Sequence, residues 1–499
     1  MATVTVNGTV FTAIPGTTLG ELLAREQLIE MPCGGRGTCG KCKVTVTGAV
    51  RAPSETEKNK LTSAELAAGV RLACRTVIEG DVAVTLADTA AAQISADGIM
   101  PEISLAPAFS FCGAAVDIGT TTLAARLYGA DGKLLAEKTA LNPQSAWGAD
   151  VISRIDAAVK GAGAALRLAT CRAIDSLIVE MAEETHIAAS DIDGAVITGN
   201  TVMLHLLTGT SPEPLSHAPF AAERLFGETL SAKALGLSAL APSAQIYLPP
   251  CVAAFLGADT VTALLASDIC RSPQTRLLVD IGTNGEMALW HEGRLMLCST
   301  AAGPAFEGAG LSMGMGGKAG AVDHVTLSEG KLYPHVIGDI SPVGICGSGV
   351  VDALACLLET GELDETGYLE EEPAVIQPPV TLTQNDVRMV QLAKSAIHAG
   401  IRTLLAEVGL TCGNMTELLI AGGFGSYLNI ENACRIGLIP SELLSRIRVI
   451  GNAALSGAAM LLLNRAYQAD LARFVAEARE VDLSTNPVFA EEYMERMMF

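Results

Sequence analysis

The chain has 499 residues and a net charge of −21, and this length predicts about three structural units. Apolar residues make up 49% of the chain, which supplies a large core and argues against disorder. Aromatic residues make up only 4%. Because nucleic acid attracts basic surfaces and stacks on aromatic rings, this composition argues against a nucleic-acid-binding protein.

The N-terminal sequence alternates like a strand and lacks the basic and apolar regions of a secretion signal. The most apolar stretch, residues 251–270, contains Asp259 and Asp268, which are costly inside a bilayer. We therefore expect a cytoplasmic protein without a membrane partner. In such a chain the 13 cysteines indicate metal binding rather than disulfides.

Residues 1–88 are predicted to form a small α+β domain. An alternating stretch turns at Asn7 and Gly8, a pair typical of a type I′ hairpin. Thr18 and Glu21 have the spacing of a capping box and predict the start of a short helix. A glycine-rich cysteine loop and further strands follow.

Four cysteines have the spacing of metal ligands, as C-x5-C-x2-C with one more downstream. Thiolates suit iron, and four of them complete a [2Fe–2S] site. Zinc is the rival metal, but structural zinc sites usually have paired C-x2-C arms and only one arm is tight here. The other nine cysteines are predicted to be core thiols. The predicted cluster ligands are Cys33, Cys39, Cys42 and Cys74.

Basic residues flank these ligands, although residues 1–90 hold equal numbers of acidic and basic residues, so the charge of −21 lies in the rest of the chain. They either offset the negative charge of the cluster or form a docking face. The docking partner would be an acidic redox protein or the acidic remainder of this chain, and such docking should be sensitive to salt. The basic residues are Arg36, Lys41, Lys43, Arg71 and Arg75.

Residues 89–111 are rich in alanine without a sustained period and are predicted to be a linker. Beyond them an apolar strand that ends in Asp-Ile-Gly-Thr, a tight turn and a second strand occur twice, at Asp117 and at Asp280. This duplication predicts two similar α/β lobes, residues 112–276 and 277–499.

The two turns have the chemistry of a phosphate site, although the chain lacks a P-loop. Their glycines let backbone amides approach phosphate, their hydroxyl and amide groups add donors, and Asp117 and Asp280 are placed to hold Mg²⁺ through water. Glu286 is a candidate for orienting the attacking water, with a simple hairpin-face carboxylate as the alternative. The predicted phosphate-binding residues are Gly119, Thr120, Thr121, Thr122, Gly282, Thr283, Asn284 and Gly285.

Two later segments are suited to bind another anionic group and the adenine or ribose of a nucleotide. Gly347, Ser348 and Gly349 begin a predicted helix whose N-terminus favours an anion. Gly422 and Gly423 end an apolar strand, where the backbone can lie flat against adenine or ribose. Together with the two turns, these segments predict ATP binding.

The residues from 113 onward resemble the superfamily of acetate and sugar kinases, Hsc70 and actin, and the cysteine segments resemble [2Fe–2S] ferredoxins. The resemblance implies a β-grasp ferredoxin domain followed by a two-lobed α/β ATPase. The combination, with residues 142–155, 199–209 and 303–314, is similar to the reductive activators of corrinoid proteins.

That resemblance implies that ATP drives one electron from the cluster onto a Co(II) corrinoid protein of a methyltransferase system, which regenerates Co(I). It also implies a low-potential electron donor and a homodimer. Longer members of the family have an additional middle domain between the ferredoxin and the ATPase, which we expect to be absent because Cys74 lies so close to Asp117. Two alternatives stay open: a small-molecule kinase that contains an iron–sulfur cluster, and an actin-like ATP-binding protein whose cluster is sensory or structural.

Overall fold

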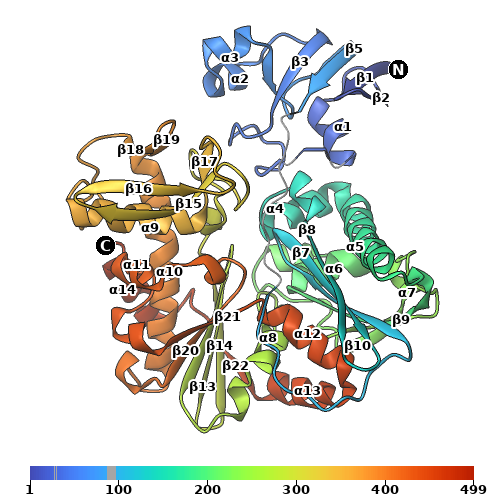
Figure 1. Cartoon of the computed structure of the whole chain (residues 1–499), viewed down its shortest axis with the longest axis vertical. Coiled ribbons are helices and arrows are strands. Elements are labelled where there is room, and N and C mark those ends of the chain that lie inside the picture. The colour runs from blue at the N-terminus through green and yellow to red at the C-terminus, as the bar shows by residue number, and fades with distance from the viewer. Residues whose placement is uncertain (27, 30, 87–96) are drawn as a thin grey trace.

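The computed structural model describes residues 1–26, 28–29, 31–86 and 97–499. A small N-terminal domain lies against a larger body that is built around two six-stranded sheets (Figure 1). Within the described residues, no helix combines the length and the apolar character needed to cross a membrane.

The N-terminal domain is a five-stranded sheet, in the order β2-β1-β5-β3-β4, that packs on helix α1 (Leu19–Arg25). The predicted hairpin is confirmed, since Asn7 and Gly8 both have positive φ, 46° and 90°, as a type I′ turn requires. The predicted capping box of α1 is also confirmed. The strands are β1 (Ala2–Val6), β2 (Thr9–Ala13), β3 (Lys43–Val50), β4 (Val70–Leu72) and β5 (Ile78–Thr85).

A buried ion pair joins helix α2 (Glu55–Lys60) to β4 of this domain; α3 (Ser63–Ala67) follows α2. The Glu57 carboxylate accepts hydrogen bonds from Arg71 Nε at 2.8 Å and from Ser54 N at 2.9 Å. Burial alone would raise the pKa of Glu57, but the hydrogen bonds from Arg71 and Ser54 hold it below its ordinary value. The pair therefore fixes the helix that lies over the end of the cysteine loop.

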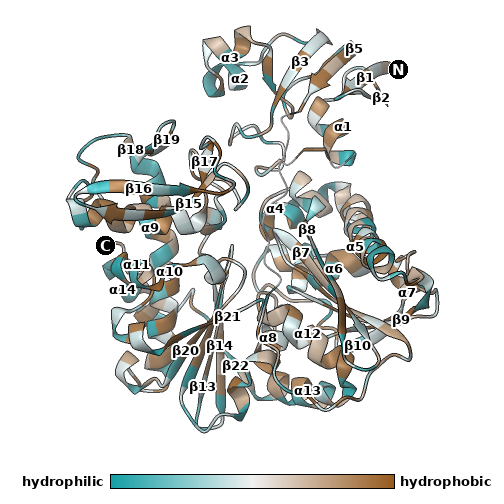
Figure 2. Cartoon of the chain, viewed as in Figure 1, coloured by the Kyte–Doolittle hydropathy of each residue, from teal (hydrophilic) through white to brown (hydrophobic). Residues whose placement is uncertain are grey.

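The two large sheets have the same core topology. In each, three antiparallel strands are followed in space by two parallel ones, and the first strand ends in the Asp-Ile-Gly-Thr turn. Hydrophobic residues run along the strands of both sheets (Figure 2). The orders are β10-β11-β9-β6-β7-β8 in the first lobe and β21-β20-β12-β13-β14-β22 in the second.

In the first lobe the strands are β6 (Cys112–Ile118), β7 (Thr122–Gly129), β8 (Leu134–Leu141), β9 (Ile192–Gly199), β10 (Glu228–Ser231) and β11 (Gln245–Leu248), and the helices are α4 (Val151–Ala157), α5 (Gly163–Thr185), α6 (Thr201–Thr208), α7 (Ala232–Leu235) and α8 (Ala258–Ser267). The strands of the second large sheet are β12 (Arg276–Ile281), β13 (Gly285–His291), β14 (Arg294–Thr300), β20 (Glu417–Ala421), β21 (Ile447–Gly451) and β22 (Ala478–Glu480).

The second lobe also contains two small sheets and six helices. The small sheets are formed by β15 (Ala321–Ser328), β16 (Lys331–Val336) and β17 (Gly344–Ile345), and by β18 (Ala374–Gln377) and β19 (Val380–Leu382). The helices are α9 (Gly347–Thr360), α10 (Gln384–Glu407), α11 (Ile430–Arg435), α12 (Ala453–Leu463), α13 (Gln468–Glu477) and α14 (Pro487–Glu495).

Helices α8 and α12 connect the lobes, because their apolar side chains share one core with residues of both sheets (Figure 1). The two helices approach so closely that a Cβ on Gly457 of α12 would collide with the carbonyl of Thr262 in α8. This close packing places the turns at the ends of β6 and β12 on either side of one interlobe space.

The predicted linker, residues 89–111, lies partly outside the described residues. From residue 97 onward it runs along the second lobe, where Ile99 N donates to Ile450 O at 3.1 Å and Ala108 N donates to Leu462 O at 3.0 Å. Residues 97–111 are therefore held on the body, which differs from the expectation of a free linker. The nine cysteines predicted to be core thiols are all buried, as expected.

We expect Arg71→Met to destabilise the N-terminal domain by about 3 kcal/mol, because it leaves a buried carboxylate without its partner. Amide exchange of β3 in the full chain should rise roughly a hundredfold. Since folding lowers the pKa of Glu57, its contribution is present at neutral pH and is lost as the pH falls through the folded-state pKa. The control is Arg51→Met, whose exposed pair with Glu79 should contribute less than about 1 kcal/mol; equal effects would contradict the prediction.

Candidate functional site

The four predicted cluster ligands lie together as two pairs of thiols. The Sγ atoms of Cys42 and Cys74 are hydrogen-bonded at 3.3 Å, and the Cys33 and Cys39 thiols are also hydrogen-bonded to each other. The hydrogen bond from Cys39 lowers the pKa of Cys33 to about 4, and the hydrogen bond from Cys74 lowers that of Cys42 to about 7. Each pair therefore stabilises one thiolate.

This arrangement fits a [2Fe–2S] cluster, in which each iron takes two thiolates. A tetrahedral metal with bonds to sulfur of about 2.3 Å separates two thiolates by roughly 3.8 Å, close to the spacing of Cys42 and Cys74. The loop closes around the site because its four glycines all have positive φ, between 58° and 77°. Those glycines are Gly34, Gly35, Gly37 and Gly40.

The second site is a cavity of about 310 Å³ between the lobes. Fourteen of the sixteen residues predicted for nucleotide binding or catalysis line it, so the two turns meet at one place. These residues are Asp117, Gly119, Thr120, Thr121, Thr122, Asp280, Gly282, Thr283, Asn284, Glu286, Gly347, Ser348, Gly422 and Gly423.

Gly285 and Gly349 are not among the lining residues. A Cβ on Gly285 would collide with Ile397, and one on Gly349 would collide with the carbonyl of Val322. Close packing within the second lobe therefore explains both glycines.

Three aspartates line the cavity, and burial is the main cause of their raised pKa values. Burial, then the charge of Asp259, raises the pKa of Asp117 to about 7 and that of Asp280 to about 7. Burial also raises the pKa of Asp259 to about 6. Asn452 Nδ2 donates to Asp117 at 3.0 Å and favours its charged form. A cation at this position would relieve the repulsion among the three carboxylates.

The cavity suits Mg²⁺ that is held by few protein ligands. Within the described ranges, no three His, Cys, Asp or Glu side chains converge on one ion position. Mg²⁺ in nucleotide sites keeps several waters and takes one or two carboxylates beside phosphate oxygens, so Asp117 and Asp280 fit this requirement.

Glu286 points into the same cavity from β13, opposite Asp280 in the strand register. Burial, then the charges of Asp259 and Asp280, raises its pKa well above the ordinary value. A protonated carboxyl is a poor base, so Glu286 orients water only when a cation has lowered its pKa. Its role stays a prediction.

Glu307 is a cavity residue that the sequence analysis missed. Its Oε2 accepts hydrogen bonds from Thr121 Oγ1 at 2.9 Å and from Thr283 Oγ1 at 2.5 Å. One carboxylate oxygen therefore connects the phosphate turns of the two lobes. The only signal in the sequence was an acidic residue in the glycine-rich segment 303–314. Asp259 was also missed, although it interrupts an apolar stretch.

Buried polar side chains hold the first turn in place. Asn142 Nδ2 donates to Gly119 O at 2.8 Å, and an Arg154 guanidinium nitrogen donates to Thr120 O at 2.5 Å. Both side chains are fully buried. They bind backbone carbonyl oxygens of the turn, so the turn is fixed without use of its amide groups, the donors that phosphate binding requires.

Other residues of the cavity suit a nucleoside. Phe306 and Phe424 stack with ring centroids 5.2 Å apart, and Gly422 has φ +90° beside the Asp280 carboxylate. The N-terminus of α9 presents Ser348 to the cavity, where an anion is favoured. The cavity therefore combines phosphate donors, a cation site and a flat apolar wall.

Family models match most of the chain. Residues 4–79 match the 2Fe-2S iron-sulfur cluster binding domain, residues 112–272 match the RACo middle region, and residues 274–499 match the C-terminal domain of RACo, the ASKHA domain. The RACo middle region coincides with the segment that we predict to be the first lobe, residues 112–276. The absence of an additional domain between the ferredoxin and the ATPase stays a prediction.

The chain is similar to curated proteins along most of its length. It is 35% identical over 419 residues to the corrinoid activation enzyme RamQ of Eubacterium limosum, and the match covers 78% of this chain and 70% of the relative. It is 26% identical over 416 residues to the [Co(II) methylated amine-specific corrinoid protein] reductase of Methanosarcina barkeri, covering 77% and 76%. A solved structure, the reductive activator for corrinoid, iron-sulfur protein, matches with a TM-score of 0.73 at 30% identity, covering 100% of this chain and 98% of that one.

We expect Cys74→Ala to lose the visible absorbance of the cluster, because one iron would keep a single protein thiolate. The wild-type chain should contain two irons and two acid-labile sulfides. Cys112→Ala is the matched control, since that buried thiol lies on β6 and its loss should leave the spectrum unchanged. An unchanged spectrum in Cys74→Ala, or zinc in place of iron, would contradict the assignment.

Binding of MgATP at pH 6.5 should release between about one and two protons, because a divalent cation requires charged carboxylates. The affinity for MgATP should therefore decrease as the pH falls below about 7, which is the pKa of Asp117 and Asp280. Calorimetry in buffers of different ionisation enthalpy measures the release. Asp259→Asn removes a charge that raises both pKa values and should reduce the release; a binding heat independent of the buffer would contradict this prediction.

Proposed function

The chain belongs to the family of reductive activators of corrinoid proteins, and on that premise we propose that it uses ATP to deliver one electron to a Co(II) corrinoid protein. The product is the Co(I) form, the nucleophile of a methyltransferase system. Family membership favours this function over a small-molecule kinase or an actin-like binding protein.

The observation that carries the proposal is the connection between the two sites. Lys41, in the loop with three of the four cluster cysteines, donates to Gly308 O and Gly314 O. The neighbours of these acceptors, Glu307 and Met315, line the nucleotide cavity. A cluster used only for sensing or for stability has no need of this placement.

The residues of the cavity bind and position the nucleotide. Thr121 and Thr283 supply hydroxyl donors for phosphate oxygens from opposite lobes. Ser348 donates its hydroxyl to Asp323 O at 2.8 Å at the start of α9, whose N-terminus favours an anion. Asp117 and Asp280 are the carboxylates that we assign to Mg²⁺. Because phosphate is contacted from both lobes, ATP and its hydrolysis products favour different lobe spacings.

The N-terminal domain holds the redox group through Cys33, Cys39, Cys42 and Cys74. When bound, a [2Fe–2S] cluster supplies one electron at a time. Three of these cysteines are buried, so the loop keeps water away from the site and limits loss of electrons to other acceptors.

The need for ATP follows from redox potentials. Plant-type clusters lie near −400 mV, and membership of the family implies a lower Co(II)/Co(I) couple. For one electron each 59 mV uphill costs about 1.4 kcal/mol. A protein that uses nucleotide binding energy to change the cobalt coordination of its bound Co(II) partner, and then releases the Co(I) form, can offset this difference.

We further assign residues 112–276 and 277–499 as the two lobes, supported by their matching sheets. A low-potential electron donor, a homodimer and a cytoplasmic location belong to the same proposal. Sedimentation of the purified chain tests the homodimer.

When the reduced protein is mixed anaerobically with a Co(II) corrinoid protein and MgATP, we expect Co(I) to form. The absorbance spectrum of the cobalt measures this reaction. Asp280→Asn should slow this reaction at least about tenfold, because it removes a charged group at the metal position. Asp156→Asn is the control, since Asp156 forms an exposed pair with Lys160. Failure to form Co(I) with several corrinoid proteins and an intact cluster would refute the function, and phosphorylation of a small molecule would support the kinase alternative.

A further inference from the structure

The cysteine loop, residues 31–41, contacts the first lobe through its backbone. Met31 N donates to Ser145 O at 3.3 Å, and Ala149 N donates to Pro32 O at 3.1 Å. Gly34 lies so close that a Cβ there would come within 2.9 Å of Trp147 O. The loop therefore fits a surface that is formed by residues 145–149.

The same loop contacts the second lobe through one side chain. Lys41 Nζ donates to Gly308 O at 3.1 Å and to Gly314 O at 2.9 Å. These acceptors are the two ends of a glycine-rich loop, residues 308–314. A single ammonium group therefore joins the N-terminal domain to a segment of the opposite lobe.

The first-lobe surface is directly connected to a phosphate turn. Asn142, three residues before Ser145, is hydrogen-bonded to Gly119 O and donates its backbone N–H to Thr121 O at 2.8 Å. Arg154 joins Thr120 O to Gly148 O. A movement of the turn therefore moves the surface that holds Met31 and Pro32.

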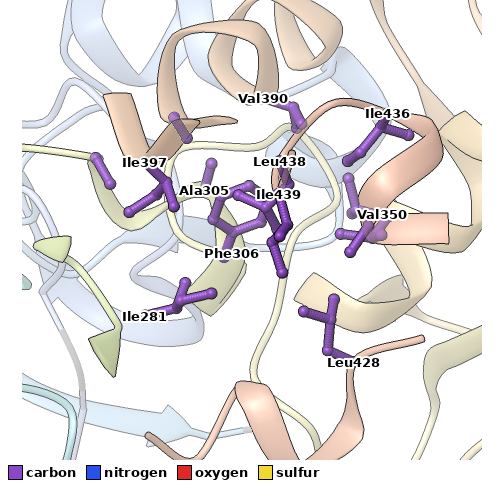
Figure 3. Close-up of a cluster of buried hydrophobic side chains, with 14 of the residues drawn as sticks. Ile281, Ala305, Phe306, Val350, Val390, Ile397, Leu428, Ile436, Leu438 and Ile439 are labelled. Atoms are coloured by element: carbon purple, nitrogen blue, oxygen red, sulfur yellow. The ribbon is translucent and has the colours of Figure 1, made fainter. Parts of the chain in front are cut away.

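The second-lobe acceptors are connected to the other turn in the same way. Gly308 follows Glu307, which accepts hydrogen bonds from Thr283 and Thr121, and Gly314 precedes Met315, which lines the cavity. Ala305 and Phe306 anchor this segment in the core of the second lobe (Figure 3). The residues around Glu307 therefore pass changes at the turn to the acceptors of Lys41.

We propose that residues 142–154 and 303–317 form a docking surface for the cysteine loop of this chain, and that MgATP binding releases the loop from it. Residues 31–41 contact both lobes. Ser145 lies three residues after Asn142, Gly308 directly follows Glu307, and both Asn142 and Glu307 hold a phosphate turn. The loop keeps both contacts only at one spacing of the lobes.

The direction of the coupling follows from Glu307. Its carboxylate shares one oxygen between Thr121 and Thr283, and these hydroxyls are the donors that a phosphate between the turns requires. A phosphate would therefore displace the Glu307 carboxylate, which carries a like charge. Displacement of Glu307 moves Gly308 O away from Lys41 and weakens docking.

Release has a consequence for electron delivery, which rests on the proposed function. The docked loop carries three cluster ligands and faces the lobes. The lobes therefore block the approach of a corrinoid protein to the cluster. Undocking in the ATP-bound chain exposes the loop to the partner. Electron delivery is thereby restricted to chains that hold ATP.

Lys41→Met tests the coupling, because it removes the donor and keeps the apolar stem. Binding and docking are reciprocal, so a variant that docks poorly should bind a non-hydrolysable MgATP analogue about fivefold tighter than wild type. Lys43→Met is the matched control: it makes the same charge change two residues away, where Lys43 pairs with Glu65 at 2.6 Å inside the N-terminal domain. Its affinity should equal that of wild type.

Hydrogen exchange of the full wild-type chain provides a second readout that needs no variant. The analogue should increase exchange of the Met31 and Ala149 amides, which are bonded across the interface. Equal affinity of Lys41→Met and Lys43→Met, weaker binding by Lys41→Met, or slower exchange with the analogue would overturn the proposal. None of these measurements uses a corrinoid protein, so failure here is distinct from failure of the proposed function.

Discussion

The burial of acidic side chains from two lobes at one cavity is the constraint on which the rest of the structure depends. Asp117, Asp280 and Asp259 are taken out of water, and the charge of Asp259 adds to burial in raising the pKa values of the other two. Their repulsion is relieved by protonation or by a cation. The binding of a metal nucleotide is therefore coupled to the spacing of the lobes. The close packing of α8 on α12 determines where the two lobes meet.

The polar groups around the cavity couple the charge state of its carboxylates to the positions of whole chain segments. Each phosphate turn is held by buried or shared polar groups instead of by solvent: Asn142 and Arg154 hold the first turn, and Glu307 holds the second. Such groups have few alternative partners, so a change at the turn is passed to the chain that carries them. Both carrier segments emerge at the surface that the cysteine loop contacts.

The basic residues around the cluster illustrate why a charge pattern alone is an incomplete guide. Lys43 and Arg71 form ion pairs inside the N-terminal domain, whereas Lys41 donates to backbone carbonyls of the second lobe. The contact agrees with docking on the rest of this chain, one of the alternatives that the sequence left open.

The sequence by itself determined the features that depend on neighbouring residues: the hairpin at Asn7, the helix cap at Thr18, the glycine loop around Cys33 and the two turns that end in Thr120 and Thr283. Backbone preferences, caps and ligand spacing act over a few residues, so they can be read from the order of amino acids. The tertiary structure decided which distant groups meet. Glu307 joins Thr121 and Thr283, residues 97–111 are held on the two lobes, and Gly285 and Gly349 serve packing. Desolvation and close contact depend on the three-dimensional approach of segments that the sequence keeps far apart.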